Sequence, residues 1–143
     1  MRRSWLVLGL VLALVGASAC QREETTGSIR IGGEAANNHG EADVAGESSV
    51  EFEVDDFYFE PTVVEGEAGQ KVALEAFNEG EATHTFTVDA LGIDKTLAPE
   101  AQTSIEVTLP DSGALLFYCR FHQSRGMRGA LSVGGDLTIN TEV

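Results

Sequence analysis

The stretch LLFYCRFHQSRGM, residues 115–127, combines a strand pattern with a loop that carries side chains able to bind a metal. Phe117 and Cys119 occupy alternate positions and so line one face of a predicted β-strand. Two residues separate Cys119 from His122, and four more separate His122 from Met127. The sequence therefore predicts a strand that ends in three candidate metal ligands.

The alternation of apolar and polar residues recurs along the chain from residue 50 onward. Val50, Phe52 and Val54, for example, alternate with acidic residues. The other segments with this period are residues 72–76, 84–88, 105–109 and 131–133. Connections are expected at residues 66–69, 78–80, 91–99 and 110–113. The pattern predicts an all-β domain of about seven strands, folded as a β-sandwich.

His84 is a fourth candidate ligand, and it lies on a different predicted strand. It shares a face with Phe86, so its imidazole points toward the apolar interior, where it is costly unless something engages it. Each residue alone has an ordinary explanation: a satisfied core His84, a small buried Cys119 and a space-filling Met127. Together with His122 they supply two imidazoles, a thiolate and a thioether, which is a set that suits copper. Zinc would accept Cys and His but gains little from a thioether.

Residues 117–133 resemble the ligand loop and last strand of the cupredoxins, above all the plastocyanin-like type 1 blue copper proteins. In overall pattern the resemblance covers residues 49–134. FYFEP at residues 57–61, followed by GEAG at residues 66–69, is similar to an early strand and turn of bacterial cupredoxin-like domains. The resemblance implies a Greek-key β-sandwich with a single type 1 copper site at one end.

The resemblance also implies a role for each candidate ligand. The implied equatorial ligands are His84, Cys119 and His122, with Met127 as the axial ligand. Two positions depart from the family pattern, because Thr85 replaces an Asn that ties the ligand loops together and Phe121 replaces a Pro. Neither position is a ligand, so we expect copper binding to persist while the reduction potential is tuned differently.

The implied activity is the transfer of single electrons between redox proteins, as the copper alternates between Cu(I) and Cu(II). The sequence offers no evident general base, nucleophile or phosphate-binding loop, so we expect no enzymatic activity. A copper carrier or store that supplies an extracytoplasmic oxidase is the alternative. A binding module without redox turnover is a third reading, which the intact ligand set disfavours.

The first twenty residues read as an export signal. Arg2 and Arg3 precede a short apolar run, and small residues lead to Cys20. Residues 1–19 are therefore predicted to be a signal peptide, and Cys20 a lipidated residue that anchors the protein to the cell membrane. Cleavage before an unmodified Cys20, giving a periplasmic protein, and an uncleaved anchor are the alternatives.

Residues 20–48 are predicted to be the lipidated cysteine and a flexible acidic linker, because they have no apolar period. His39, within this linker, is interpreted as solvated rather than as a ligand. Residues 49–134 would form the cupredoxin domain, and residues 135–143 a short tail.

The charge of the chain limits its partners. It has 23 acidic and 9 basic residues, with a formal net charge of -14, so nucleic acid is an improbable partner. Arg120, Arg125 and Arg128 nevertheless cluster around the predicted ligand loop. They could form a basic rim that attracts an acidic redox partner, or be scattered surface charges. We expect the protein to act as a monomer.

Overall fold

The computed structural model describes residues 26–138. The predicted signal peptide, Cys20 and the end of the predicted tail lie outside these residues. Two short 3-10 helices, η1 (Asp89–Leu91) and η2 (Gln123–Arg125), interrupt a structure that is otherwise strands and turns. Within residues 26–138, no helix is long and apolar enough to cross a membrane.

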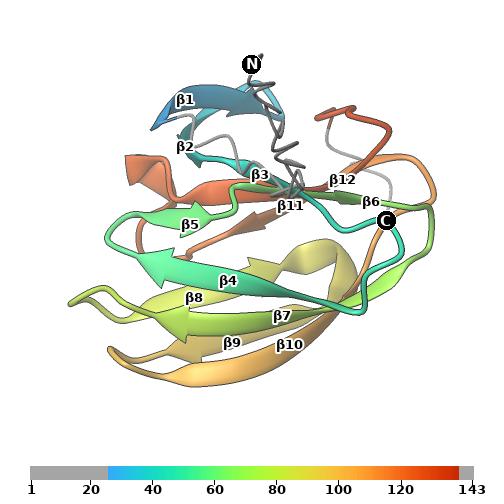
Figure 1. The fold of residues 1–143 in the computed structure, drawn as a ribbon. Helices are drawn as coiled ribbons and strands as arrows, with labels where there is room; N and C mark the ends of the chain where they lie inside the picture. Colours follow the sequence, from blue (N-terminus) through green and yellow to red (C-terminus); the bar gives the residue numbers. More distant parts are fainter. Residues whose placement is uncertain (1–25, 139–143) are drawn as a thin grey trace, which may run out of the picture.

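Two β-sheets face each other as a sandwich (Figure 1). The four-stranded sheet contains, in spatial order, β10 (Gln102–Thr108), β7 (Lys71–Asn78), β4 (Ser49–Asp55) and β5 (Tyr58–Glu60). The six-stranded sheet contains β3 (Glu41–Asp43), β6 (Val63–Gly66), β12 (Arg128–Val133), β11 (Gly113–Tyr118), β8 (His84–Val88) and β9 (Ile93–Leu97). The chain crosses between the sheets after β3, β5, β6, β7, β9 and β10. The predicted all-β sandwich fold is confirmed.

Aromatic side chains fill the space between the sheets directly behind the strands that carry His84 and Cys119. Phe52, Phe59, Phe86 and Phe117 are fully buried, with ring centroids 5.1–6.2 Å apart. Burial of one such side chain contributes about 1.5–3 kcal/mol, and edge-to-face contacts add to this. The strands that deliver the ligands therefore rest on a well-packed aromatic core.

Some connections predicted from the sequence are strands in the structure. Residues 91–99 contain β9, which pairs with β8 over its whole length. Ile93 lies opposite Val88 at one end of the pair, and Leu97 lies opposite His84 at the other. Strand β9 lacks alternation because only Leu97 is fully buried, so backbone pairing rather than side-chain burial defines it. The short strand β6 was not predicted, because its consecutive residues Val63 and Val64 are both buried and so do not alternate. Strand β5 lies within the FYFEP stretch that resembles an early strand.

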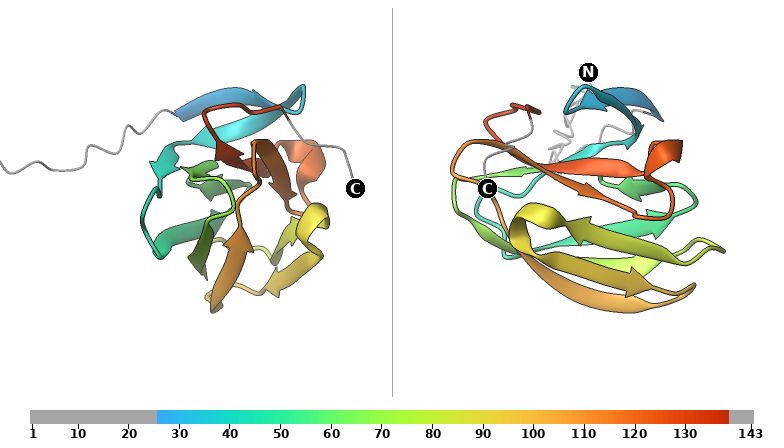
Figure 2. Two further views of the ribbon diagram at one scale, coloured as in Figure 1. Left: turned by 90° about the vertical axis from the view of Figure 1, so that its right-hand side faces the viewer. Right: turned by 180° about the vertical axis from the view of Figure 1, so that it is seen from behind.

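The prediction that residues 21–48 form a flexible linker is wrong for the described part, residues 26–48. Strands β1 (Thr26–Ile31) and β2 (Glu34–His39) form an antiparallel hairpin, which Figure 2 shows lying on the outside of the sandwich. Strand β3 pairs in parallel with β6. Ile31 and Ala36 pack on Ala114 and Ala130 of the six-stranded sheet. A few apolar side chains are enough to hold these residues on the sandwich, because the six-stranded sheet already offers an ordered surface for the hairpin and a free edge for β3.

His39 is not a solvated residue, contrary to the prediction. It is half-buried, and its ring stacks on Tyr58 with centroids 3.4 Å apart and an interplanar angle of 6°. Its backbone N–H donates to Thr62 Oγ1 at 2.7 Å. His39 thus helps to fasten the hairpin to the sandwich. Within residues 26–138, the group of side chains that could hold a metal ion does not include His39.

Candidate metal centre

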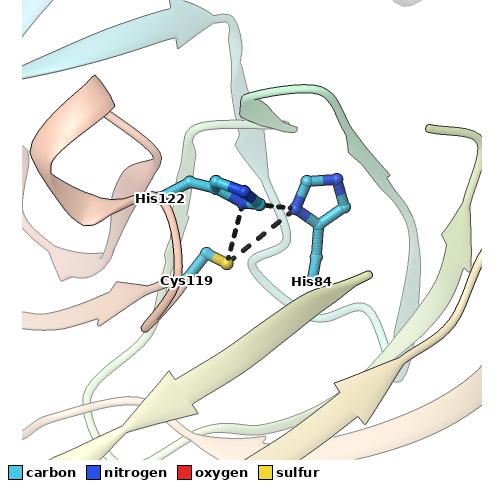
Figure 3. A group of neighbouring side chains, drawn as sticks. All are labelled: His84, Cys119 and His122. Atoms are coloured by element: carbon cyan, nitrogen blue, oxygen red, sulfur yellow. Dashed lines mark hydrogen bonds between the residues drawn. The ribbon is translucent and has the colours of Figure 1, made fainter. Parts of the chain in front are cut away.

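Three of the four predicted ligands meet at one end of the sandwich (Figure 3). His84 is the first residue of β8, Cys119 directly follows β11, and His122 precedes η2. His84 Nδ1 lies 3.1 Å from His122 Nδ1 and 3.8 Å from Cys119 Sγ, and His122 Nδ1 lies 3.5 Å from Cys119 Sγ. In residues 26–138 this is the only such group of His, Cys and acidic side chains.

These distances fit a single metal ion. Nitrogen and thiolate ligands bind zinc at about 2.0–2.1 Å and 2.3 Å, and equatorial ligands at such bond lengths are roughly 3–4 Å apart. The three distances between the ligand atoms of His84, Cys119 and His122 fall in this range. Two imidazoles and one thiolate in a plane match the donor set of a type 1 copper site. The residues present therefore fit the metal that the sequence predicts.

Met127 is fully buried and closes the ligand loop through its backbone. Its carbonyl oxygen accepts a hydrogen bond from the Cys119 N–H at 3.1 Å, and its N–H donates to the His122 carbonyl at 3.3 Å. These bonds keep Met127 next to the two ligands of the loop. Its role as the axial ligand stays a prediction.

Thr85 ties the two ligand segments together. Its backbone N–H donates to Cys119 Sγ at 3.3 Å, and its side-chain Oγ1 accepts a hydrogen bond from the Arg120 N–H at 2.9 Å. The threonine thus replaces the Asn of the family pattern with a side-chain contact of its own. The hydroxyl is fully buried with its residue, so this contact is shielded from water.

The electrostatics of the group favour the thiolate form of Cys119. Burial raises the pKa of the Cys119 thiol, but hydrogen bonds from His84, Thr85 and other neighbours lower it overall to about 6. Burial lowers the pKa of His84, whereas hydrogen bonds with Cys119 and Asp56 raise it, with a net upward shift. A thiolate is the ligand form of cysteine. The surroundings of Cys119 therefore favour the ionised form that binds a metal ion.

Residues that were not predicted to belong to the site complete its surroundings. The turn between β4 and β5 places the Asp56 carboxylate 2.7 Å from His84 Nε2 and the Phe57 ring 4.6 Å from the His122 ring. From β2, the Asn37 amide donates to the carbonyl oxygens of Phe57 and Arg125, both at 2.9 Å. Spacing could not reveal these contacts, because they join segments that are distant in sequence.

The three arginines of the predicted rim have different surroundings. The Arg120 Nε donates to Asp94 at 2.9 Å, so its charge is partly balanced. The Arg125 guanidinium lies 3.6 Å from the centroid of the Phe57 ring. Arg128 is half-buried and donates to the Gln123 carbonyl at 3.2 Å. Of these three arginines, only Arg125 is both exposed and without an acidic partner among residues 26–138.

A β-sandwich that gathers two imidazoles and one thiolate at the end of its strands defines a class of protein, the copper-binding electron-transfer domains with one type 1 site. The chain belongs to the cupredoxin-like domain family, whose sequence profile matches residues 9–133.

Solved structures of similar fold include blue copper proteins. Auracyanin from Roseiflexus castenholzii, in its dithionite-reduced form, has a TM-score of 0.51 and 17% identity, over 62% of this chain and 98% of that chain. Auracyanin B has a TM-score of 0.51 and 20% identity, over 68% and 93% of the two chains. A chain of a heme-copper terminal oxidase dimer has a TM-score of 0.52 and 14% identity, over 62% of this chain and 65% of that chain. No curated protein matches the chain.

Proposed function

We propose that this protein carries single electrons between redox proteins outside the cytoplasm, with copper held by His84, Cys119, His122 and Met127. The observation that carries the proposal is the preformed ligand group. In it, Cys119 Sγ accepts a hydrogen bond from the Thr85 N–H, and the Cys119 N–H donates one to the Met127 carbonyl oxygen. Bound copper would supply the one-electron change between Cu(I) and Cu(II).

The fixed ligands suit electron transfer because little has to move when the charge of the metal changes. His84, Cys119 and Met127 are fully buried, and the Phe52–Phe117 aromatic core packs behind the strands that carry them. A copper carrier must instead release its metal, which accessible ligands favour. The burial of three ligands therefore argues against the alternative of copper delivery to an oxidase.

The exposed edge of the site is the expected path for electrons. His122 is the one predicted ligand that is partly exposed, and Phe121 beside it is 53% exposed. Arg125 lies over Phe57 at the same end of the molecule. An apolar contact surface next to a cation suits brief docking of an acidic redox protein. We assign the docking face to this edge.

The proposal includes an anchor at Cys20. A signal-like segment that ends at a cysteine supports lipidation and attachment to the outer side of the cell membrane. Mass spectrometry of the N-terminal peptide from native membranes tests this assignment. A diacylated Cys20 supports it, whereas a free Cys20 thiol in a protein recovered only in soluble fractions overturns it.

The central experiment is copper titration of the purified protein. We expect one equivalent of Cu(II) to give an intense blue colour from thiolate-to-copper charge transfer, and reversible loss of colour on reduction. Cys119→Ser should bind copper without the blue colour, while the parent protein serves as its control. A mutant as blue as the parent would contradict the site. Rapid transfer of copper, rather than of electrons, to an accepting partner would favour the carrier function.

A further inference from the structure

His84 is held from both sides. In Figure 3 its Nδ1 faces Cys119 and His122, while its other ring nitrogen, Nε2, points away from them. That Nε2 lies 2.7 Å from Oδ1 of Asp56, and the His84 side chain is completely buried. The imidazole therefore bridges a metal-binding group and a carboxylate.

Asp56 is itself firmly positioned. Its Oδ2 accepts a hydrogen bond from the Glu81 N–H at 3.0 Å, and its Oδ1 accepts one from the Ala82 N–H at 3.2 Å. A Cβ at Gly80 would collide with the same carboxylate, so the loop before β8 is shaped around it. The carboxylate thus joins the β4–β5 turn to the loop that leads into His84.

A carboxylate on the remote nitrogen of a metal-binding imidazole has two consequences. It keeps the proton on Nε2, which leaves Nδ1 free to bind the metal, and it makes the ring a stronger donor. Its negative charge also favours the more positive oxidation state of a nearby metal ion. The Asp56 side chain is 27% exposed, so water screens this charge only in part.

We propose that Asp56 is a positioning residue that orients His84 through Nε2 and lowers the reduction potential of the copper site by stabilising Cu(II) relative to Cu(I). The inference rests on the copper site of the proposed function. The departures from the family pattern at Thr85 and Phe121 do not involve this contact, so it is a separate influence on the potential.

The test compares Asp56→Asn with Glu81→Gln as the matched control. Both variants remove one negative charge from the same part of the surface, but the Glu81 backbone, not its side chain, contacts Asp56. Affinities for Cu(I) and Cu(II) are measured by chelator competition, and the potential by redox titration. Outer-shell substitutions typically change metal affinity 10–100-fold. We expect the ratio of Cu(II) to Cu(I) affinity to fall about tenfold in Asp56→Asn, which equals a rise of about 59 mV.

Asp56→Glu keeps the charge and should return the potential toward the parent value. Equal weakening of both oxidation states in Asp56→Asn, or an equal shift in Glu81→Gln, would overturn the inference while copper binding stands. A parent protein that binds no copper would overturn the proposed function and this inference together.

A measurement without variants guards against poor folding of Asp56→Asn. NMR of ¹⁵N-labelled histidine in the reduced protein should report a protonated Nε2 on His84. Protonation of Nδ1 instead would exclude the proposed orientation.

Discussion

The side-chain amide of Asn37 donates a hydrogen bond to the carbonyl oxygen of Arg125 at 2.9 Å, and so links the N-terminal hairpin to the ligand loop. The same amide reaches the Phe57 carbonyl, and the Asn37 backbone N–H donates to the Gly126 carbonyl at 2.9 Å. One residue of β2 therefore holds both the turn that carries Asp56 and the loop that carries His122.

Asn37→Ala should loosen the ligand loop. Two hydrogen bonds of about 1 kcal/mol each would be lost, so we expect the free energy of unfolding to fall by about 1–2 kcal/mol. Copper release to a chelator should become faster. Asn38→Ala is the control, since the Asn38 side chain accepts a bond from Gly40 N–H instead. Equal release rates in the two variants would contradict a role for Asn37 in holding the loop.

Thr85→Val should destabilise the protein while leaving it blue. The substitution removes the acceptor of the Arg120 N–H but keeps the backbone N–H that contacts the Cys119 sulfur. A buried donor left without a partner costs about 1–3 kcal/mol, which chemical denaturation would measure. Thr85→Ser restores the hydroxyl and should recover most of the loss. A stable Val variant would mean that the hydroxyl contributes little.

Met127→Gln should keep copper but lower the reduction potential. An oxygen donor stabilises Cu(II) more than a thioether does, provided that position 127 is axial. Met127→Leu, which offers no donor, is the comparison and should not lower the potential. Redox titration decides between them, and an unchanged potential in the Gln variant would remove Met127 from the ligand set.

Gly129→Ala should destabilise the sandwich. An added Cβ would overlap the ring of Phe117 and the carbonyl oxygen of Thr62, both of which are fully buried. Overpacking of this kind costs about 1–3 kcal/mol, so the thermal midpoint should fall. Gly27→Ala, where no atom lies within 4 Å of the new Cβ, should unfold like the parent. Matching midpoints for the two variants would refute the expectation.

Replacement of Arg125 and Arg128 by Gln should slow electron transfer to an acidic partner at low salt and leave the blue spectrum intact. Rim charges act mainly on association, and salt screens them over about 8 Å at physiological ionic strength. The difference should therefore shrink as salt is added. Lys71→Gln is the control, because it removes an exposed charge at the start of β7, the end of that strand away from the loop that leads to His84. A double variant as fast as the parent would place docking elsewhere.

The parts of the molecule that the sequence revealed are those in which the signal is local. Alternation predicted β4, β7 and β10 because one face of each is buried, and close spacing predicted that Cys119 and His122 share a site. Strand β9 pairs along its backbone without such alternation, and so it was missed.

The contacts that the sequence concealed are long-range. Asp56 lies 28 residues before His84, and Asn37 lies 88 residues before Arg125. Neither belongs to a motif with its partner. The hairpin itself was read as linker because it contributes few apolar side chains, and the sheet that it covers supplies the rest of its stability.

The early start of the folded domain has a consequence for where the protein can work. Strand β1 begins at Thr26, only six residues after Cys20. Even fully extended, six residues span roughly 20 Å. With lipid on Cys20, this short tether would prevent the protein from crossing a wide compartment. The protein would diffuse along the bilayer surface, and would exchange electrons with complexes whose redox centres are accessible from that surface.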